Sequence, residues 1–181
     1  MMMAANINAD IRHARARGWA YWQPIDGRAG PDKEQHWGFI DAKYPKDAND
    51  KTKPKLADLD HAKLFVFAQY SRHIRPGMQI IDPGKDENTV VAYDRNRRKL
   101  VIVTASWAEN GQYVGYDLSG FAQVAGNDGK VKRWATTDTG NSKGERYQHH
   151  ADDTRLQNDK KFWAWFPPNS VQTFEIDNVT P

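Results

Sequence analysis

The hydrophobic pattern of this chain changes its period at Pro76-Gly77, and this change restricts the folds that the chain can adopt. Before it, apolar residues recur at helical spacing in two segments, residues 4–17 and about 59–74. After it, short apolar segments alternate in period two and are separated by turns such as Glu109-Asn110-Gly111. The sequence therefore predicts a mainly β chain, in which an antiparallel β-sandwich over residues 76–181 follows an α/β segment over residues 1–75.

The second part of the chain contains about seven short strand candidates separated by turn residues, as is typical of an antiparallel sandwich. We expect strands at residues 90–94, 100–107, 112–118, 130–137, 146–151, 162–166 and 171–176. The large side chains of Trp107, Phe162 and Trp165 are expected to contribute to the core of this sandwich.

The first part of the chain is too small to enclose a core of its own. Residues 19–23 form a short aromatic segment between a helix and Pro24, and apolar residues on both faces are typical of a strand inside a parallel sheet or barrel. Residues 37–41 are a second short strand candidate. Because two helices and one or two strands cannot close a core, we expect this part to belong to a larger α/β unit and Met1 to lie inside a longer protein.

Composition excludes several classes of function. Cysteine is absent, which excludes thiol catalysis, cysteine-ligated zinc and a disulfide framework. The 26 basic and 23 acidic residues are interspersed, so the net charge of +3 does not favour a nucleic-acid-binding surface. No long uncharged apolar stretch is present that could cross a membrane as a helix. We expect neither a nucleic-acid partner nor a membrane partner.

Metal ligands and catalytic carboxylates are not indicated either. His149 and His150 would point to opposite faces of a strand, so they would not chelate one ion. The turn at residues 126–129 lacks the ligand spacing of a calcium loop, and we expect no metal and no cofactor. The five glutamates are expected to be solvated, with the last one on the solvent face of the final strand; they are Glu34, Glu87, Glu109, Glu145 and Glu175.

Three segments carry a resemblance to a known family. Residues 18–23 (Gly-Trp-Ala-Tyr-Trp-Gln) with 37–41 (Trp-Gly-Phe-Ile-Asp) resemble the last barrel strand and following loop of glycoside hydrolase family 30. Residues 67–77 resemble the link from that family's last barrel helix into its side domain, and residues 166–174 resemble its C-terminal strand. The sequences of these segments are most similar to those of the fungal endo-β-1,6-galactanases.

The resemblance implies an architecture and a substrate. It implies a β-sandwich side domain preceded by the last helix–strand–helix remnant of a (β/α)₈ barrel. Family members hydrolyse glycosidic bonds with retention, using two glutamates on earlier barrel strands, so the resemblance implies that this chain carries no catalytic residue and is inactive alone. The implied substrate is a β-1,6-linked galactan or similar polysaccharide. No secretory signal is recognisable, although secretion is expected of the full-length family.

Three residues are the candidates for sugar binding. The resemblance implies that Trp22 and Gln23 line the subsite next to the scissile bond, because barrel active sites form at the C-terminal ends of strands. Trp37, in the following loop, is a weaker candidate, whereas Trp19 and Tyr21 are expected to be core residues. Two other functions stay open, namely a stand-alone carbohydrate-binding β-sandwich module and a nucleic-acid-binding β domain.

Overall fold

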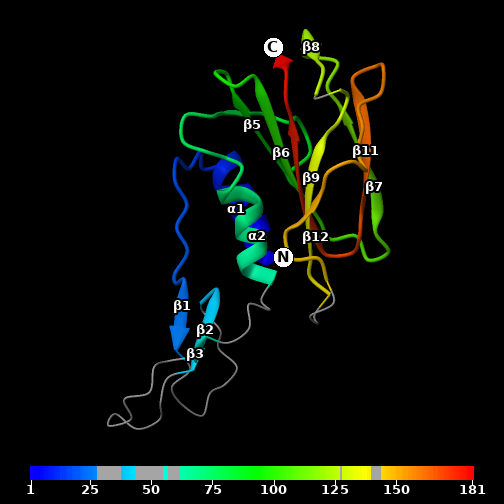
Figure 1. Ribbon diagram of the computed structural model, residues 1–181. Helices are drawn as coiled ribbons and strands as arrows, with labels where there is room; N and C mark the ends of the chain where they lie inside the picture. Colours follow the sequence, from blue (N-terminus) through cyan, green and yellow to red (C-terminus); the bar gives the residue numbers. More distant parts are fainter. Residues whose placement is uncertain (28–37, 44–54, 57–61, 127, 140–143) are drawn as a thin grey trace, which may run out of the picture.

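The computed structural model describes residues 1–27, 38–43, 55–56, 62–126, 128–139 and 144–181. Within these residues it contains two helices and thirteen strands, most of them short (Figure 1). In chain order the elements are α1 (Met2–Arg12), β1 (Ile25–Gly27), β2 (Ile40–Lys43), β3 (Lys55–Leu56), α2 (Ala62–Ser71), β4 (Gln79–Ile81), β5 (Thr89–Asp94), β6 (Lys99–Ser106), β7 (Gln112–Asp117), β8 (Gln123–Val124), β9 (Lys132–Thr137), β10 (Gln148–His150), β11 (Lys161–Phe166), β12 (Ser170–Ile176) and β13 (Val179–Thr180).

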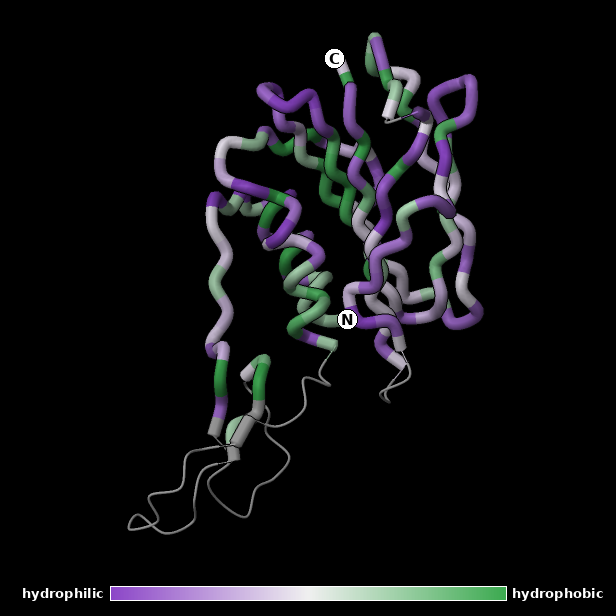
Figure 2. Tube along the Cα trace, viewed as in Figure 1, coloured by the Kyte–Doolittle hydropathy of each residue, from purple (hydrophilic) through white to green (hydrophobic). Residues whose placement is uncertain are grey.

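A six-stranded antiparallel sheet is the centre of the molecule. Its strands lie in the order β10-β9-β12-β6-β5-β4, so the last long strand of the chain lies between β9 and β6. The strands β5, β6 and β12 are buried on both faces, and the middle of β5 and β6 is accordingly apolar at nearly every position, whereas β12 also buries Ser170, Gln172 and Thr173. Figure 2 shows β5 and β6 largely in green at the centre.

The antiparallel pair β7–β11 covers one face of the six-stranded sheet and completes a sandwich. The core between the two layers is built largely from aromatic and aliphatic side chains that alternate with outward-facing residues along each strand. Tyr116 stacks on Phe162 with ring centroids 4.6 Å apart, and Phe174 of β12 lies 5.2 Å from Phe162. The mainly β fold class with an antiparallel sandwich, predicted from the sequence, is confirmed.

Both helices pack on the opposite face of the same sheet (Figure 1). Ile7 of α1 and Val66 of α2 are buried in one cluster with Val90 and Val101 of the sheet. Polar contacts fix the positions of the helices: Tyr70 donates a hydrogen bond to Asn8 (2.8 Å) and Gln69 donates one to Thr136 of β9 (2.9 Å). The helices therefore form a third layer that shares the sheet with β7–β11.

Helix α1 ends earlier than its apolar pattern predicts. The sequence predicts a helix to residue 17, whereas α1 ends at Arg12 and Arg15 has a φ of 52°. In the turn that follows, the amide of Ala16 donates to the carbonyl of Asp10 over 3.0 Å. The turn brings the chain back toward α2 and leads into residues 19–23.

Residues 19–23 do not form the strand that the sequence predicts; they have no regular secondary structure, and the chain bends at Trp22. Gln23 and Pro24 accept backbone hydrogen bonds from Phe39 (3.1 Å) and Ile40 (3.0 Å), and regular parallel pairing begins at β1 and β2. No described segment forms a ladder with residues 19–22. The strand prediction was wrong because a short apolar run on both faces indicates only that a segment is suited to a buried strand, whereas a strand also requires a neighbour with which to pair.

Two of the three predicted core residues of the sandwich also lie elsewhere. Phe162 is fully buried as predicted, but Trp107 and Trp165 are 36% and 44% exposed. Trp107 follows the end of β6, where the side chain no longer faces the second layer. Trp165 lies on the outward face of β11, one residue away from the buried Ala164 and Phe166.

Candidate functional site

The segment of residues 19–23 is held against the helices by the aromatic side chains of Trp19 and Tyr21. Tyr21 stacks on Phe39 with ring centroids 4.4 Å apart and ring planes at 23°. Trp19 lies 5.7 Å from Phe67 of α2, and Phe67 lies 5.1 Å from Phe39. Trp19 and Tyr21, predicted to be core residues, are partly buried and pack against the core cluster beneath the helices, so one side of the segment is fixed by aromatic contacts.

Polar atoms of the same side chains tie the segment to both helices. The indole nitrogen of Trp19 donates a hydrogen bond to Asp10 of α1 (2.8 Å). The ammonium group of Lys63, in α2, donates to the Tyr21 hydroxyl over 3.4 Å and lies 5.9 Å from the centre of its ring. The segment is thus positioned by hydrogen bonds as well as by aromatic packing.

Trp22 points away from this support. Its side chain is 78% exposed, the largest exposed fraction of any described tryptophan. Gln23 is half-buried, and its amide donates to Asp26 over 3.2 Å. The backbone passes close to Gly38 here, where a β-carbon would stand 2.7 Å from Asp26. An exposed indole on a fixed segment presents a flat apolar surface on which a ring-shaped ligand can stack.

The predicted site residues are only partly placed. Trp22 and Gln23 are adjacent, and the peptide bond between them is cis. Trp37 lies outside the described residues, so its role stays a prediction from the sequence. The structure therefore brings two of the three candidates together.

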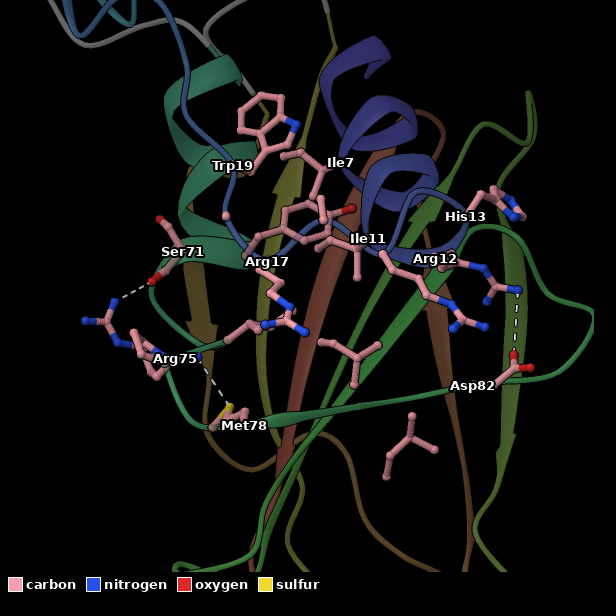
Figure 3. Close-up of a pocket in the computed structure, with 18 of the residues that line it drawn as sticks. Ile7, Ile11, Arg12, His13, Arg17, Trp19, Ser71, Arg75, Met78 and Asp82 are labelled. Carbon is pink, nitrogen blue, oxygen red and sulfur yellow. Dashed lines mark hydrogen bonds and ion pairs between the residues drawn. The ribbon is translucent and has the colours of Figure 1, made fainter.

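A pocket of about 990 Å³ opens between α1, α2 and β4 (Figure 3). Ile7, Ile11 and Trp19 form part of its apolar lining. Arg12 donates to the carbonyls of Thr89 and Gly84, each over 3.0 Å, and Arg75 donates to that of Ser71 over 2.6 Å. Trp22 is not among the lining residues. Since both guanidinium groups bond backbone oxygens, they support the adjoining loops.

The described glutamates do not share one environment. Glu87 and Glu109 are exposed, as the sequence predicts. Glu145 lies 2.6 Å from the Nε2 atom of His150. Glu34 lies outside the described residues. Each described carboxylate is therefore either in solvent or engaged with a partner of its own.

Glu175 is not on the solvent face as predicted; it is the centre of a polar cluster between α2 and the sheet. Its carboxylate lies 2.8 Å from the Nδ1 atom of His73 and 2.7 Å from the ammonium group of Lys99. The Tyr147 hydroxyl contacts the other nitrogen of His73 at 2.7 Å. Burial alone would raise the pKa of Glu175, but the bonds and charges of His73 and Lys99 outweigh burial and lower it to about 2.

Metal ligands do not gather in the part of the chain that the structure describes: no group of three histidine or acidic side chains there could hold an ion. His149 stacks on Trp134 with centroids 4.5 Å apart, whereas His150 contacts Glu145 and Asp153. The two histidines thus have separate partners, as their alternation predicts. None of the described helices has the length and apolar character needed to cross a membrane.

Sequence reasoning missed a second group of exposed aromatic residues. Tyr113, Trp163 and Trp165 lie on the outward face of β7–β11 and are 73%, 49% and 44% exposed. The run from Phe162 to Phe166 contains no polar residue, so alternation alone could not show which set faces the core. Gly111 and Gly115, four residues apart on the neighbouring segment, were the available signal, because glycines leave room for large side chains across a strand pair.

Comparison with known proteins gives a consistent result. No protein-family model matches the chain. The endo-beta-1,6-galactanase of Hypocrea rufa is 39% identical over 177 residues, which is 98% of this chain and 32% of that protein. The chain therefore spans about a third of the length of this relative.

Solved structures share the fold. A glycoside hydrolase family 30 subfamily 8 xylanase from Clostridium acetobutylicum superposes with a TM-score of 0.66 at 17% identity, over 97% of this chain and 38% of the xylanase. The catalytic domain of GH30 xylanase C from Talaromyces cellulolyticus gives 0.62 at 18% identity, over 97% and 34%. The chain is thus homologous to an endo-beta-1,6-galactanase over nearly its full length, and it has the fold of the matching part of glycoside hydrolase family 30 enzymes.

Proposed function

We propose that this chain is the C-terminal part of a retaining glycoside hydrolase whose substrate is a β-1,6-linked galactan. In this proposal residues 1–75 are the end of a (β/α)₈ barrel and residues 76–181 are its β-sandwich side domain. The identity of 39% to an endo-beta-1,6-galactanase over 98% of the chain supports the proposal. The observation that carries it is Trp22, which projects into solvent from a segment whose other face is fixed by Tyr21, Phe39 and Lys63.

The proposed role of the site is to hold a sugar ring and not to cleave it. Retention requires two carboxyl groups roughly 5 Å apart, one as nucleophile and one as acid and base. We assign both to the part of the longer protein that precedes these residues. Trp22 stacks on the sugar next to the scissile bond, Gln23 adds an amide beside it, and Trp37 contributes from the following loop.

The first consequence is that the chain alone does not hydrolyse galactan. Without the carboxylate pair, the largest catalytic contributions are missing. Purified chain incubated with β-1,6-galactan should release reducing ends at the background rate. Turnover that is lost in Glu145→Gln would assign catalysis to this chain and contradict the proposal.

A chimeric enzyme tests the positive part of the proposal. The matching third of the Hypocrea rufa enzyme is replaced by residues 1–181, and hydrolysis of β-1,6-galactan is measured. We expect activity in the chimera and a loss of at least tenfold in kcat/KM on Trp22→Ala. The matched control is Trp107→Ala, a tryptophan at the end of β6 that is 36% exposed. A folded but inactive chimera, or one that is indifferent to Trp22→Ala, would contradict the proposed role.

A carbohydrate-binding module is the second candidate, and one observation favours it. Tyr113, Trp163 and Trp165 are exposed on one sheet face without any help from residues 1–75. A module of this kind would bind polysaccharide but would not restore hydrolysis in the chimera. The chimera therefore separates the two candidates.

A further inference from the structure

The outward face of β7–β11 carries an aromatic surface, defined here as Tyr113, Trp163 and Trp165. Trp163 pairs across the strands with Gly115, and Trp165 pairs with Tyr113. The intervening side chains of β11 are buried against the six-stranded sheet. The aromatic surface is therefore formed by the strand residues that the core does not use.

Glycines beneath the two indoles determine how the tryptophans lie. A β-carbon on Gly115 would stand 2.7 Å from the indole nitrogen of Trp163. A β-carbon on Gly111 would stand 2.6 Å from the Cζ2 atom of Trp165. Each indole thus leans across the strand pair and occupies the space left by a missing side chain. Rings seated in this way are held in place and still have 49% and 44% of their surface in contact with solvent.

The third ring extends the surface. Tyr113 contacts Trp165 edge to face, with centroids 5.1 Å apart and planes at 63°. Trp163 and Trp165 are two residues apart on one strand, or about 7 Å along it. The three rings are therefore close enough for one short oligomeric ligand to contact all of them.

Charge at the surface points to a neutral ligand. At one end Lys161 lies 3.7 Å from Asp117, its cross-strand partner, and 3.1 Å from Asp159. These charges pair with each other, and the outward positions between them and Trp165 hold only aromatic residues and glycine. A nucleic acid would require a row of basic groups.

Size argues against a protein partner. With roughly 200 Å² for each large aromatic side chain, the exposed fractions amount to about 330 Å² in total. A stable protein complex buries about 800 Å² on each partner. The aromatic surface is thus too small for a second copy of this chain or another protein, and it is large enough for a few sugar units.

We propose that Tyr113, Trp163 and Trp165 bind a neutral polysaccharide chain by stacking on the apolar faces of its sugars. The choice of polysaccharide among neutral ligands rests on the proposed function. The competing explanation is that the indoles stabilise the strand pair by covering its glycines. That explanation predicts a loss of stability in variants of these residues and no binding.

Affinity electrophoresis of the full chain tests the proposal. Native gels contain soluble β-1,6-galactan or xylan, and the reference gel contains neither. We expect retardation by at least one of them and at least a fivefold weaker apparent affinity for Trp163→Ala and Trp165→Ala. Trp107→Ala is the matched control, because this tryptophan follows β6, is 36% exposed and lies outside both proposed sugar sites, and it should leave the retardation unchanged. No retardation by either polysaccharide would overturn the proposal, as would retardation that persists in both sheet variants.

A second measurement needs no variant and holds even if the substitutions prevent folding. Exposed indoles of the unaltered chain are oxidised with N-bromosuccinimide, with and without galactan or xylan, and the modified peptides are identified by mass spectrometry. We expect protection of Trp163 and Trp165 and continued oxidation of Trp107. Unprotected Trp163 and Trp165 would overturn the inference. A chimera that still hydrolyses galactan would leave the proposed function standing in that case, so the two failures are distinguishable.

Discussion

Glu175 shows how a charged side chain can be used inside a sheet of apolar strands. It lies on β12, and its side chain is 13% exposed. The carboxylate contacts His73, which follows the end of α2, and Lys99 of β6. Lys99 also lies 3.6 Å from Asp177, and burial, which lowers the pKa of Lys99, is outweighed by these two carboxylates, which raise it. The cluster links the end of the helical layer to the sheet by charge and hydrogen bonding, beside the ring contact of His73 with Trp134 of β9.

Replacing Glu175 by glutamine should destabilise the protein at neutral pH and not at low pH. Its pKa is lowered to about 2 in the folded state, so its ionised form adds stability above the ordinary pKa of 4.5. That contribution is lost as the pH falls from 4.5 toward 2. We expect Glu175→Gln to lower the free energy of unfolding by about 2 kcal/mol at pH 7, after allowance for solvent screening.

Urea unfolding at pH 7 and pH 2.5 measures this difference. The gap between Glu175→Gln and the unaltered chain should close at the lower pH. Glu109→Gln, an exposed glutamate in a turn, is the control and should show no gap at either pH. An equal gap at both values would mean that the carboxylate acts through packing and not through charge.

Substitutions of Trp19 and Trp22 should have different effects, one on stability and the other on function, although the two residues lie three positions apart. Trp19 packs on Tyr21 and Phe67 and donates a hydrogen bond to Asp10. Trp19→Ala should therefore lower the unfolding free energy by about 2–4 kcal/mol. Trp22→Ala, at a 78% exposed site, should change it by less than about 0.5 kcal/mol.

Denaturant midpoints of both variants, together with their activity in the chimeric enzyme, check this pair. We expect Trp22→Ala to reduce hydrolysis at an unchanged midpoint, and Trp19→Ala to lower the midpoint. A large loss of stability in Trp22→Ala would show that its side chain packs against the rest of the protein in solution and is not available to bind a ligand.

At the scale of elements, β11 shows what a sequence pattern can and cannot predict. Its existence and extent follow from the aromatic content of residues 162–166 and the turn residues around them. Which side chains of β11 face the core does not follow from the sequence, because Phe162, Trp163 and Trp165 are all large and apolar. The cross-strand register decides which set is buried, and that register depends on β7, some fifty residues earlier.

The segment of residues 19–23 shows the same division between local and distant information. The sequence predicted a strand apolar on both faces with Trp19 and Tyr21 as core residues, and the structure has no strand there and places both side chains partly buried against the helical core. Whether such a segment becomes a strand depends on neighbours contributed by other parts of a protein. For the candidate site, only the resemblance singled out Trp22, and its exposure and the backbone bonds around it could not be predicted from the residues themselves.

The two aromatic positions of β11 should respond differently to truncation. Phe162 is fully buried against Tyr116 and Phe174, so Phe162→Ala should cost about 3–5 kcal/mol. Trp165→Ala should cost about 1 kcal/mol, since the ring is 44% exposed and covers one glycine. Guanidinium unfolding of both variants measures the difference. Equal costs would indicate that the outward face of β11 is covered by another part of the chain.

At the scale of the whole molecule, the six-stranded sheet contributes to two hydrophobic cores, one under β7–β11 and one under the helices. Along β5, Val90 and Ala92 face the helices, whereas Val91 and Tyr93 face β7–β11. Neither layer can be removed without uncovering a hydrophobic face of the strands that the other layer uses. The helical layer therefore supports the sandwich, whatever larger unit it belongs to.

Unfolding of the full chain should accordingly be a single cooperative transition. Ile7→Ala, in α1, removes a buried side chain from the helical core and should cost about 2–5 kcal/mol. Because the two cores share one sheet, Ile7→Ala should shift the unfolding transitions seen by far-ultraviolet circular dichroism and by tryptophan fluorescence together. Phe162→Ala, on the opposite face of the sheet, should also shift both transitions together. The control is Ile80→Ala on the edge strand β4, whose side chain is 41% exposed, and it should shift neither signal strongly. If Ile7→Ala separated the two signals, the helices would unfold as an independent unit, and residues 76–181 would be a domain that is stable without them.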